Sequence, residues 1–214
     1  MNRSATAAPE SRARHRQTAV LVCASVLCWL DPAPAFAHGS LSIGEFYSGM
    51  LHPLLHFETV LPTLALALWA GQLHDADAWR LPLAFLTAAL LGALAGIFEI
   101  DLGLGRSLLL LSMLVLGLLV AARQRLPAAV ALALALVFGL YSGQLNTYAP
   151  GESIERPFLF LTGLGATLGL ILFHVGTRVH RYRAFWMQTG VRVVGSWIAA
   201  TGLLVLALEW GTRA

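Results

Sequence analysis

The stretch LGRSLLLLSMLVLGLLVAA, residues 104–122, decides the fold class of this chain. It carries no charged residue after Arg106, and a helix of about 20 apolar residues is long enough to cross the hydrocarbon core of a bilayer. Other segments of the same kind lie on both sides of it. The six segments that we expect to span a membrane are 54–70, 81–100, 104–122, 128–145, 158–175 and 191–208.

The composition of the whole chain agrees with this pattern. Of its 214 residues, 57% are hydrophobic and 12% are charged, whereas a typical soluble domain has about 25% charged residues. We therefore predict an all-α, polytopic membrane protein with six transmembrane helices. Helical spacing of apolar residues between Leu41 and Leu51 adds a short interfacial or re-entrant helix at the outer face. The net charge of +3 is too small and scattered to indicate a nucleic-acid partner.

The first 37 residues have the pattern of a secretory signal. Four arginines precede a short apolar run from Thr18 to Leu30, and Ala35–Ala37 forms an A-x-A cleavage site. We predict a signal peptide at 1–37 and a six-helix transmembrane domain at 38–214; the alternative is an uncleaved first transmembrane helix. Because Cys23 and Cys28 both lie in the signal, the mature chain would contain no disulfide and no thiolate metal site.

Arginine positions predict the orientation of the bundle. With the mature N-terminus outside, the inner loops 71–80, 123–126 and 178–183 contain six arginines, against three in the outer connections and the C-terminal tail. Short inner loops carry an excess of basic residues. We therefore expect a bacterial inner-membrane protein with both mature termini on the periplasmic side.

Residues 52–58, HPLLHFE, place two imidazoles and a carboxylate at the outer end of the first span. Ionisable groups in a membrane segment are costly, and imidazole with carboxylate suits Ni(II), Cu(II) or Zn(II). His52 and His56 are four residues apart, which puts them on one helix face. With Pro53 as the first residue of the helix, His52 would lie at its cap. The alternative is that both histidines are simply hydrated in the headgroup region. Glu58 lies deeper and needs a partner, a proton or water.

Further polar residues belong to the same predicted end of the bundle. Glu99 ends the second span, and it is either part of the same pocket or a solvated helix end. His38, the predicted first mature residue, offers its amine and imidazole as a chelate, or is a flexible terminus. His174 lies toward the inner end of the fifth span, as a second station on a pathway or as a donor to a backbone carbonyl. The fourth span ends with polar side chains that we expect to converge on the pocket: Tyr141, Ser142, Gln144 and Asn146.

Several segments, taken in order, resemble the HupE/UreJ family of membrane proteins, which are encoded with hydrogenase and urease systems and regarded as nickel permeases. The segment 44–53, GEFYSGMLHP, is similar to the family's opening, and LALWA at 66–70 resembles its GLWA-type ending. The resemblance covers nearly all of the mature chain and implies a metal permease. Further segments that resemble the family are GIFE at 96–99, SMLVLGLL at 112–119, FGLY at 138–141, LFHVG at 172–176 and the stretch 192–205.

The family's central motif, His-x5-Asp-His, is altered in this chain. His52 fits its first position and Glu58 takes the Asp position, whereas Thr59 replaces the second histidine. His56 stands where the family usually has glycine. On the fourth span, SGQLN at 142–146 replaces an HGxAHG-like run and its two histidines. The residues that the resemblance carries over are His38, His52, Glu58, Glu99 and His174.

These patterns predict capture and permeation of a divalent transition metal. His52, His56 and Glu58 would bind the ion, Glu99 and His38 would complete an outer site, and His174 would be a later contact. The metal would be Ni(II), Cu(II) or Zn(II), and no other cofactor is expected. The alternative is a diverged accessory or structural subunit of a membrane complex.

The sequence also indicates the class of partner. We expect the lipid bilayer, the metal ion and either other membrane subunits or a second copy of the chain, but no nucleic acid. The sequence contains no hydrolase elbow, phosphate loop, haem motif or zinc-protease motif, so we do not expect an enzyme.

Overall fold

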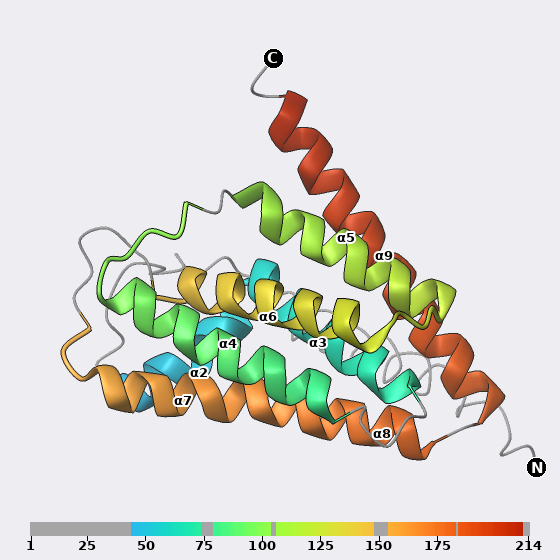
Figure 1. Cartoon of the computed structure of the whole chain (residues 1–214), viewed down its shortest axis with the longest axis horizontal. Helices are drawn as coiled ribbons and strands as arrows, with labels where there is room; N and C mark the ends of the chain where they lie inside the picture. The colour runs from blue at the N-terminus through green and yellow to red at the C-terminus, as the bar shows by residue number, and fades with distance from the viewer. Residues whose placement is uncertain (1–43, 74–78, 104–105, 148–153, 183, 212–214) are drawn as a thin grey trace, which may run out of the picture. The chain divides into compact units, whose positions relative to one another are not determined.

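A computed structural model describes residues 44–73, 79–103, 106–147, 154–182 and 184–211 (Figure 1). Regular structure in these ranges is entirely helical, which confirms the predicted all-α class. The predicted signal peptide and His38 lie outside the described residues. The elements are α2 (Glu45–Leu55), α3 (Phe57–Gln72), α4 (Arg80–Ile97), α5 (Arg106–Ala122), α6 (Ala128–Leu145), α7 (Pro157–Gly169), the π-helix η1 (Leu170–Val175), α8 (Gly176–Arg181) and α9 (Phe185–Gly211).

Four helical stretches in the described ranges are long and apolar enough to cross a membrane: α4, α6, the continuous run from α7 through η1 to α8, and α9. The pair α2 and α3 qualifies as a fifth only when taken together, because the two helices meet at an angle of 78°. Helix α5 is apolar but only 17 residues long. Each segment predicted to span the membrane therefore contains a helix.

Helices pack in pairs, and glycines bring their backbones together. The closest pairs are α4 with α6, α5 with α9, and α2 with α7. A Cβ atom at Gly49 of α2 would overlap the backbone carbonyl of Phe160 in α7, and one at Gly117 of α5 would overlap the backbone of α9. Small residues permit this close approach in lipid, where the hydrophobic effect does not drive helices together.

Helix α3 forms the centre of the bundle. It contacts α5, η1 and α8 most extensively, and its segment Ala65–Ala70 is almost fully buried. By contrast, only 33–44% of the residues in the long apolar helices are buried within the chain. Their remaining apolar faces point outward, as expected for surfaces that contact lipid tails.

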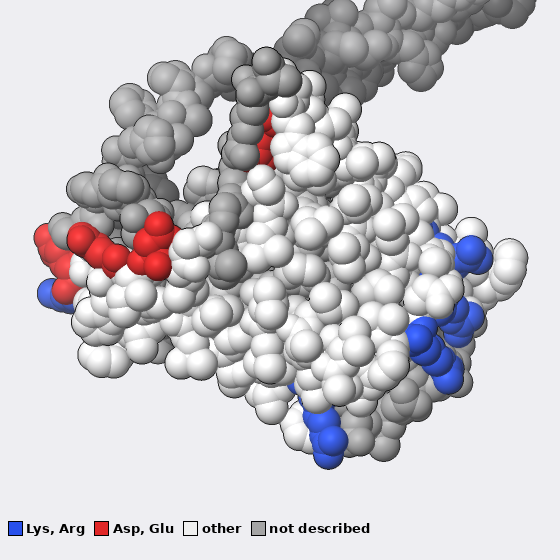
Figure 2. Space-filling model, turned by 45° about the horizontal axis from the view of Figure 1, so that its top comes forward, with Lys and Arg blue, Asp and Glu red and all other residues white. Residues whose placement is uncertain are grey.

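Charged side chains separate toward the two ends of the helices. Glu45, the first residue of α2, accepts a hydrogen bond from the backbone N–H of Glu155, just before α7, at 3.2 Å. Glu99 follows the end of α4, and Glu209 near the end of α9 accepts from the hydroxyl of Ser107 at the start of α5. Most of the described arginines lie at the other end, where α3, α5 and α8 terminate and α4 begins. Figure 2 shows most of the visible acidic side chains at the left, a smaller acidic patch near the top, and most of the basic side chains toward the right and the lower edge.

Candidate functional site

The candidate site is built around the break between α2 and α3. His56 is both the C-cap of α2 and the N-cap of α3, and its backbone is extended (φ −107°, ψ 103°). Thr59 stabilises the break, because its hydroxyl lies 3.0 Å from the carbonyl oxygen of His56 and 3.2 Å from that of Pro53. Its single proton is thus shared between the end of one helix and the start of the next.

The structure corrects the expected role of Pro53. This residue lies inside α2 and does not open the following helix, which begins at Phe57. Packing of α2 against α7 holds the helix together past the proline. The missing N–H of Pro53 removes only the helical bond to the carbonyl of Gly49. The predicted short helix before the first span is therefore present as α2, and it ends four residues later than the predicted range, at Leu55.

The side chains of His52, in α2, and His56, at the break, lie close together. Their ring centroids are 4.6 Å apart and their planes are tilted by 38°. His52 is half-buried at the last turn of α2, and His56 is exposed. Phe160 of α7 packs edge-on against His52, with centroids 6.1 Å apart. The two rings are therefore close together, although His56 has an extended backbone and is not part of the helix whose face was expected to carry both.

Asn146, just beyond the end of α6, supplies the clearest polar contact of this pair. Its Oδ1 lies 3.1 Å from Nδ1 of His52, although the two residues are 94 positions apart in sequence. The side-chain amide nitrogen of Asn146 donates to the carbonyl oxygen of Ser142 at 2.7 Å. The polar end of the fourth span therefore does converge on the histidines, through Asn146.

Other polar residues near the end of α6 are buried and tie the surrounding segments together. Gln144 donates from Nε2 to the carbonyl of Ile100, and the Thr147 hydroxyl donates to the carbonyl of Ala93. Two buried atoms, Oγ of Ser142 and Oε1 of Gln144, have no hydrogen-bond partner among the described residues. Such atoms are costly to bury unless water or another ligand reaches them.

Glu58 is half-buried in the first turn of α3. A carboxylate at this position interacts favourably with the partial positive charge of the helix N-terminus. Pro62, one turn later, lacks the N–H that would bond the carbonyl of Glu58 within the helix. The first turn of α3 therefore offers both a carboxylate and a backbone oxygen, although Glu58, His52 and His56 do not come together as a group of three ligands in the described part of the chain.

The remaining predicted site residues are placed differently. Glu99 is exposed and follows the end of α4 with a left-handed backbone (φ 56°), and His174 is exposed on η1. Within the described ranges, no three of His52, His56, Glu58, Glu99 and His174 form a group of metal-ligating side chains. His38 lies outside those ranges, so its relation to the histidine pair stays a prediction.

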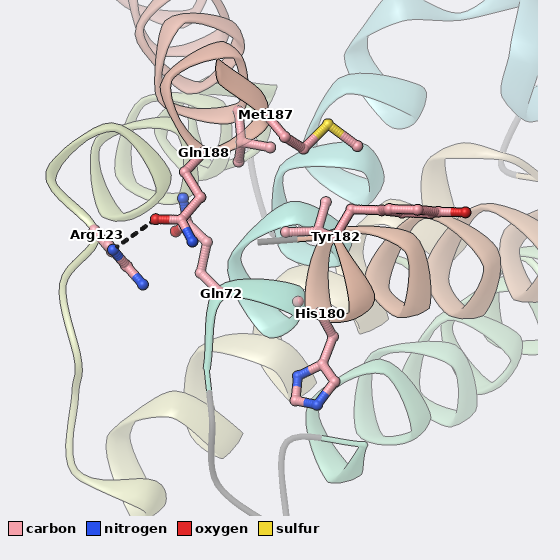
Figure 3. Close-up of a pocket in the computed structure, with 9 residues that line it drawn as sticks. Gln72, Arg123, His180, Tyr182, Met187 and Gln188 are labelled. Carbon is pink, nitrogen blue, oxygen red and sulfur yellow. Dashed lines mark hydrogen bonds between the residues drawn. The ribbon is translucent and has the colours of Figure 1, made fainter. Parts of the chain in front are cut away.

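A separate cavity lies at the other end of α3, roughly 24 Å along the helix axis from His56. It has about 350 Å³ of empty space, part of it open to solvent, between α3, α8 and α9. In Figure 3, Arg123 donates to Oε1 of Gln188 at 3.1 Å, whereas His180 points away from that pair. The Nδ1 atom of His180 lies 3.2 Å from the carbonyl oxygen of Leu73. This cavity contains none of the predicted metal ligands.

Long apolar helices with outward-facing apolar surfaces are those of a multi-pass membrane protein, here with a histidine pair at a break between two helices. The sequence profile of the HupE / UreJ protein family matches residues 26–205, and the chain belongs to this family. A curated relative, Protein HupE of Rhizobium leguminosarum bv. viciae, is 28% identical over 181 residues, which is 82% of this chain and 91% of the relative. No solved structure matches the chain significantly.

Phe160 and the bridging role of Thr59 were missed by sequence reasoning. Thr59 was noted only as a replacement for a family histidine, and Asn146 only as one of several polar residues on the fourth span. Threonine hydroxyls often bond to backbone carbonyls three or four residues earlier, but the role of Thr59 becomes visible only once the break at His56 is known. By contrast, nothing in the sequence pairs Phe160 with His52, because that contact depends on how α7 packs against α2.

Proposed function

We propose that this chain captures a divalent transition-metal ion and conducts it across the bacterial inner membrane. The observation that carries the proposal is the His52–His56 pair at the break between α2 and α3. Metal–nitrogen bonds of about 2.0–2.1 Å bring two imidazole ligands of one ion close together. Rings with centroids 4.6 Å apart need only side-chain rotation to reach that arrangement.

The surroundings of the pair support an ion site. Glu58 adds a carboxylate within the first turn of α3, and a broken helix is a common way to offer ligands inside a membrane protein. The unpartnered oxygens of Ser142 and Gln144 favour water in the neighbouring interior. His38 and Glu99 would complete the outer site, and His174 would act later. Ni(II), Cu(II) and Zn(II) all suit these ligands.

The arrangement in the membrane follows from the charges. Six spans, with α2–α3 and the short α5 each counted as one, place the arginine-rich ends of the helices inside. The proposed mature chain begins after Ala37 and has both termini outside. Single cysteines at Arg125 and Glu155 of a chain without Cys23 and Cys28 test this: an impermeant thiol reagent should label position 155 in intact spheroplasts and position 125 only after lysis. The reverse labelling would contradict the orientation.

Metal content and uptake test the function. The full chain, purified in detergent, should retain nickel, zinc or copper, and cells that express it should accumulate that ion. His52→Ala, His56→Ala and Glu58→Gln should each reduce both quantities. His180→Ala, which removes an imidazole from the distant cavity, is the matched control and should leave both unchanged. Equal binding and uptake in the wild type and the three site variants would refute the permease.

The second candidate is an accessory or structural subunit of a membrane complex. It is favoured by one observation: within the described residues, no three metal-ligating side chains come together. A subunit of this kind would bind no metal when purified and would co-purify with other membrane proteins in stoichiometric amounts. Gentle solubilisation followed by mass spectrometry of the isolated complex distinguishes it from the permease.

A further inference from the structure

Asn146 is held in one orientation by two neighbours. The residue is 1% exposed, and its side-chain nitrogen lies 2.7 Å from the carbonyl oxygen of Ser142. A backbone carbonyl only accepts hydrogen bonds, so the amide atom that faces it must be the NH₂ group. The amide oxygen must then be the atom that faces His52.

This orientation decides the proton position on His52. The amide oxygen of Asn146 is also only an acceptor, and it lies 3.1 Å from Nδ1 of His52. Nδ1 therefore carries the hydrogen and donates it to Asn146. In neutral His52 the lone pair is on Nε2, the nitrogen that is then able to bind a metal.

We propose that Asn146 is a positioning residue that holds His52 in the Nδ1–H tautomer and so selects Nε2 as its metal-binding atom. Metal-binding histidines commonly donate their other ring N–H to an oxygen acceptor, which fixes both tautomer and ring orientation. Phe160 and His56 pack against the same ring and restrict its rotation further. The statement about metal binding rests on the proposed function, whereas the tautomer does not.

The tautomer is measured directly by NMR. The full chain, labelled with ¹⁵N-histidine in detergent micelles at about pH 8, gives separate nitrogen signals for ring N–H and for unprotonated ring nitrogen. His52→Gln identifies the signals of His52. Nδ1 of His52 should give the protonated type of signal, and Nε2 the unprotonated type. Wild-type His52 with its hydrogen on Nε2 overturns the proposal.

Three variants at Asn146 and Ser142 distinguish a positioning role of Asn146 from a role in folding. Asn146→Ala removes the acceptor and should shift His52 to a mixture of tautomers or to Nε2–H. Asn146→Asp keeps an oxygen toward His52 and should retain Nδ1–H, even if the loss of the donor to Ser142 lowers stability. Ser142→Ala keeps the backbone carbonyl that Asn146 contacts and should leave the His52 signals unchanged. An Asn146→Ala spectrum identical to that of the wild type also overturns the proposal.

A metal titration of the same samples links positioning to binding. If the proposed function holds, Asn146→Ala should weaken Ni(II) binding by about 10- to 100-fold, and Asn146→Asp should restore most of it. If the wild type binds no metal while the His52 tautomer responds to the Asn146 variants as expected, the permease proposal is refuted and the positioning role of Asn146 stands. If the wild type binds metal and Asn146→Ala binds it equally well, Asn146 has no positioning role toward the ion.

Discussion

Gly92 of α4 packs directly against the backbone carbonyl of Leu140 in α6, so that a single added methyl group would overlap this oxygen. Gly143 of α6 makes the reciprocal contact with the carbonyl of Ala89 in α4. At these two glycines the backbones of α4 and α6 are in direct contact, and we call this contact the α4–α6 seam. Because α6 ends in Asn146, the same seam determines where the polar end of α6 lies.

We expect Gly92→Ala to destabilise the bundle by about 1–3 kcal/mol, the usual cost of forcing extra atoms into a packed interior. Gly169→Ala is the matched control. A Cβ at Gly169 would meet only a side-chain carbon of Leu86, at 3.7 Å, so this variant should be as stable as the wild type or slightly more stable. Thermal unfolding in detergent measures both. Equal midpoints for the two variants would contradict the seam.

Thr59→Val should destabilise the protein by about 1–3 kcal/mol, because it removes the hydroxyl that donates to the carbonyl of buried Pro53 at the break between α2 and α3. Thr59→Ser keeps the hydroxyl and should cost less. Thr63→Val is a control one turn along α3, where the lost bond goes to a carbonyl inside the helix. Chemical unfolding compares the three variants. A Thr59→Val protein as stable as Thr63→Val would show that the hydroxyl does not hold the break.

Glu99→Gly should raise stability by about 1 kcal/mol or less, because only glycine adopts the left-handed backbone of Glu99 without strain. Arg123→Gly is the matched control, since Arg123 has the same backbone conformation (φ 52°) after α5. If Glu99 also completes the metal site, its glycine variant alone should lose metal affinity. A loss of stability in both variants would refute the strain argument.

Metal binding should weaken on acidification, because imidazoles bind metals in their neutral form and protons compete with the ion. Affinity measured by calorimetry should fall as the pH is lowered. Affinity that does not change with pH would exclude the histidine pair as ligands.

The sequence predicted the helices well because long apolar runs allow few alternatives in a membrane protein. The helix α6 was predicted with its observed bounds, 128–145. The break at His56 was not predicted, because local rules place a proline at the start of a helix, whereas packing of α2 on α7 keeps Pro53 inside one. Of the two interpretations offered for Glu99, the solvated helix end agrees with its exposed position. The exposed position of His174 was not apparent, since it depends on which face η1 turns toward its neighbours.

The candidate site was predictable only in part. The spacing of His52 and His56 predicted that the two rings lie close together, but it assumed a helix through both residues, whereas α2 ends at Leu55 and His56 is extended. The contact between His52 and Asn146 joins residues 94 positions apart. Such a contact is set by the order in which helices pack, which a local pattern does not contain.

The separation of acidic and basic side chains has a kinetic consequence. Carboxylates gathered at one mouth of the bundle create a negative potential there, which raises the local concentration of cations and their rate of encounter with the protein. Screening shortens the reach of this field to about 10 Å at 0.1 M ionic strength. The rate at which a divalent ion first reaches this end should therefore fall steeply as monovalent salt is added, even where equilibrium binding changes little.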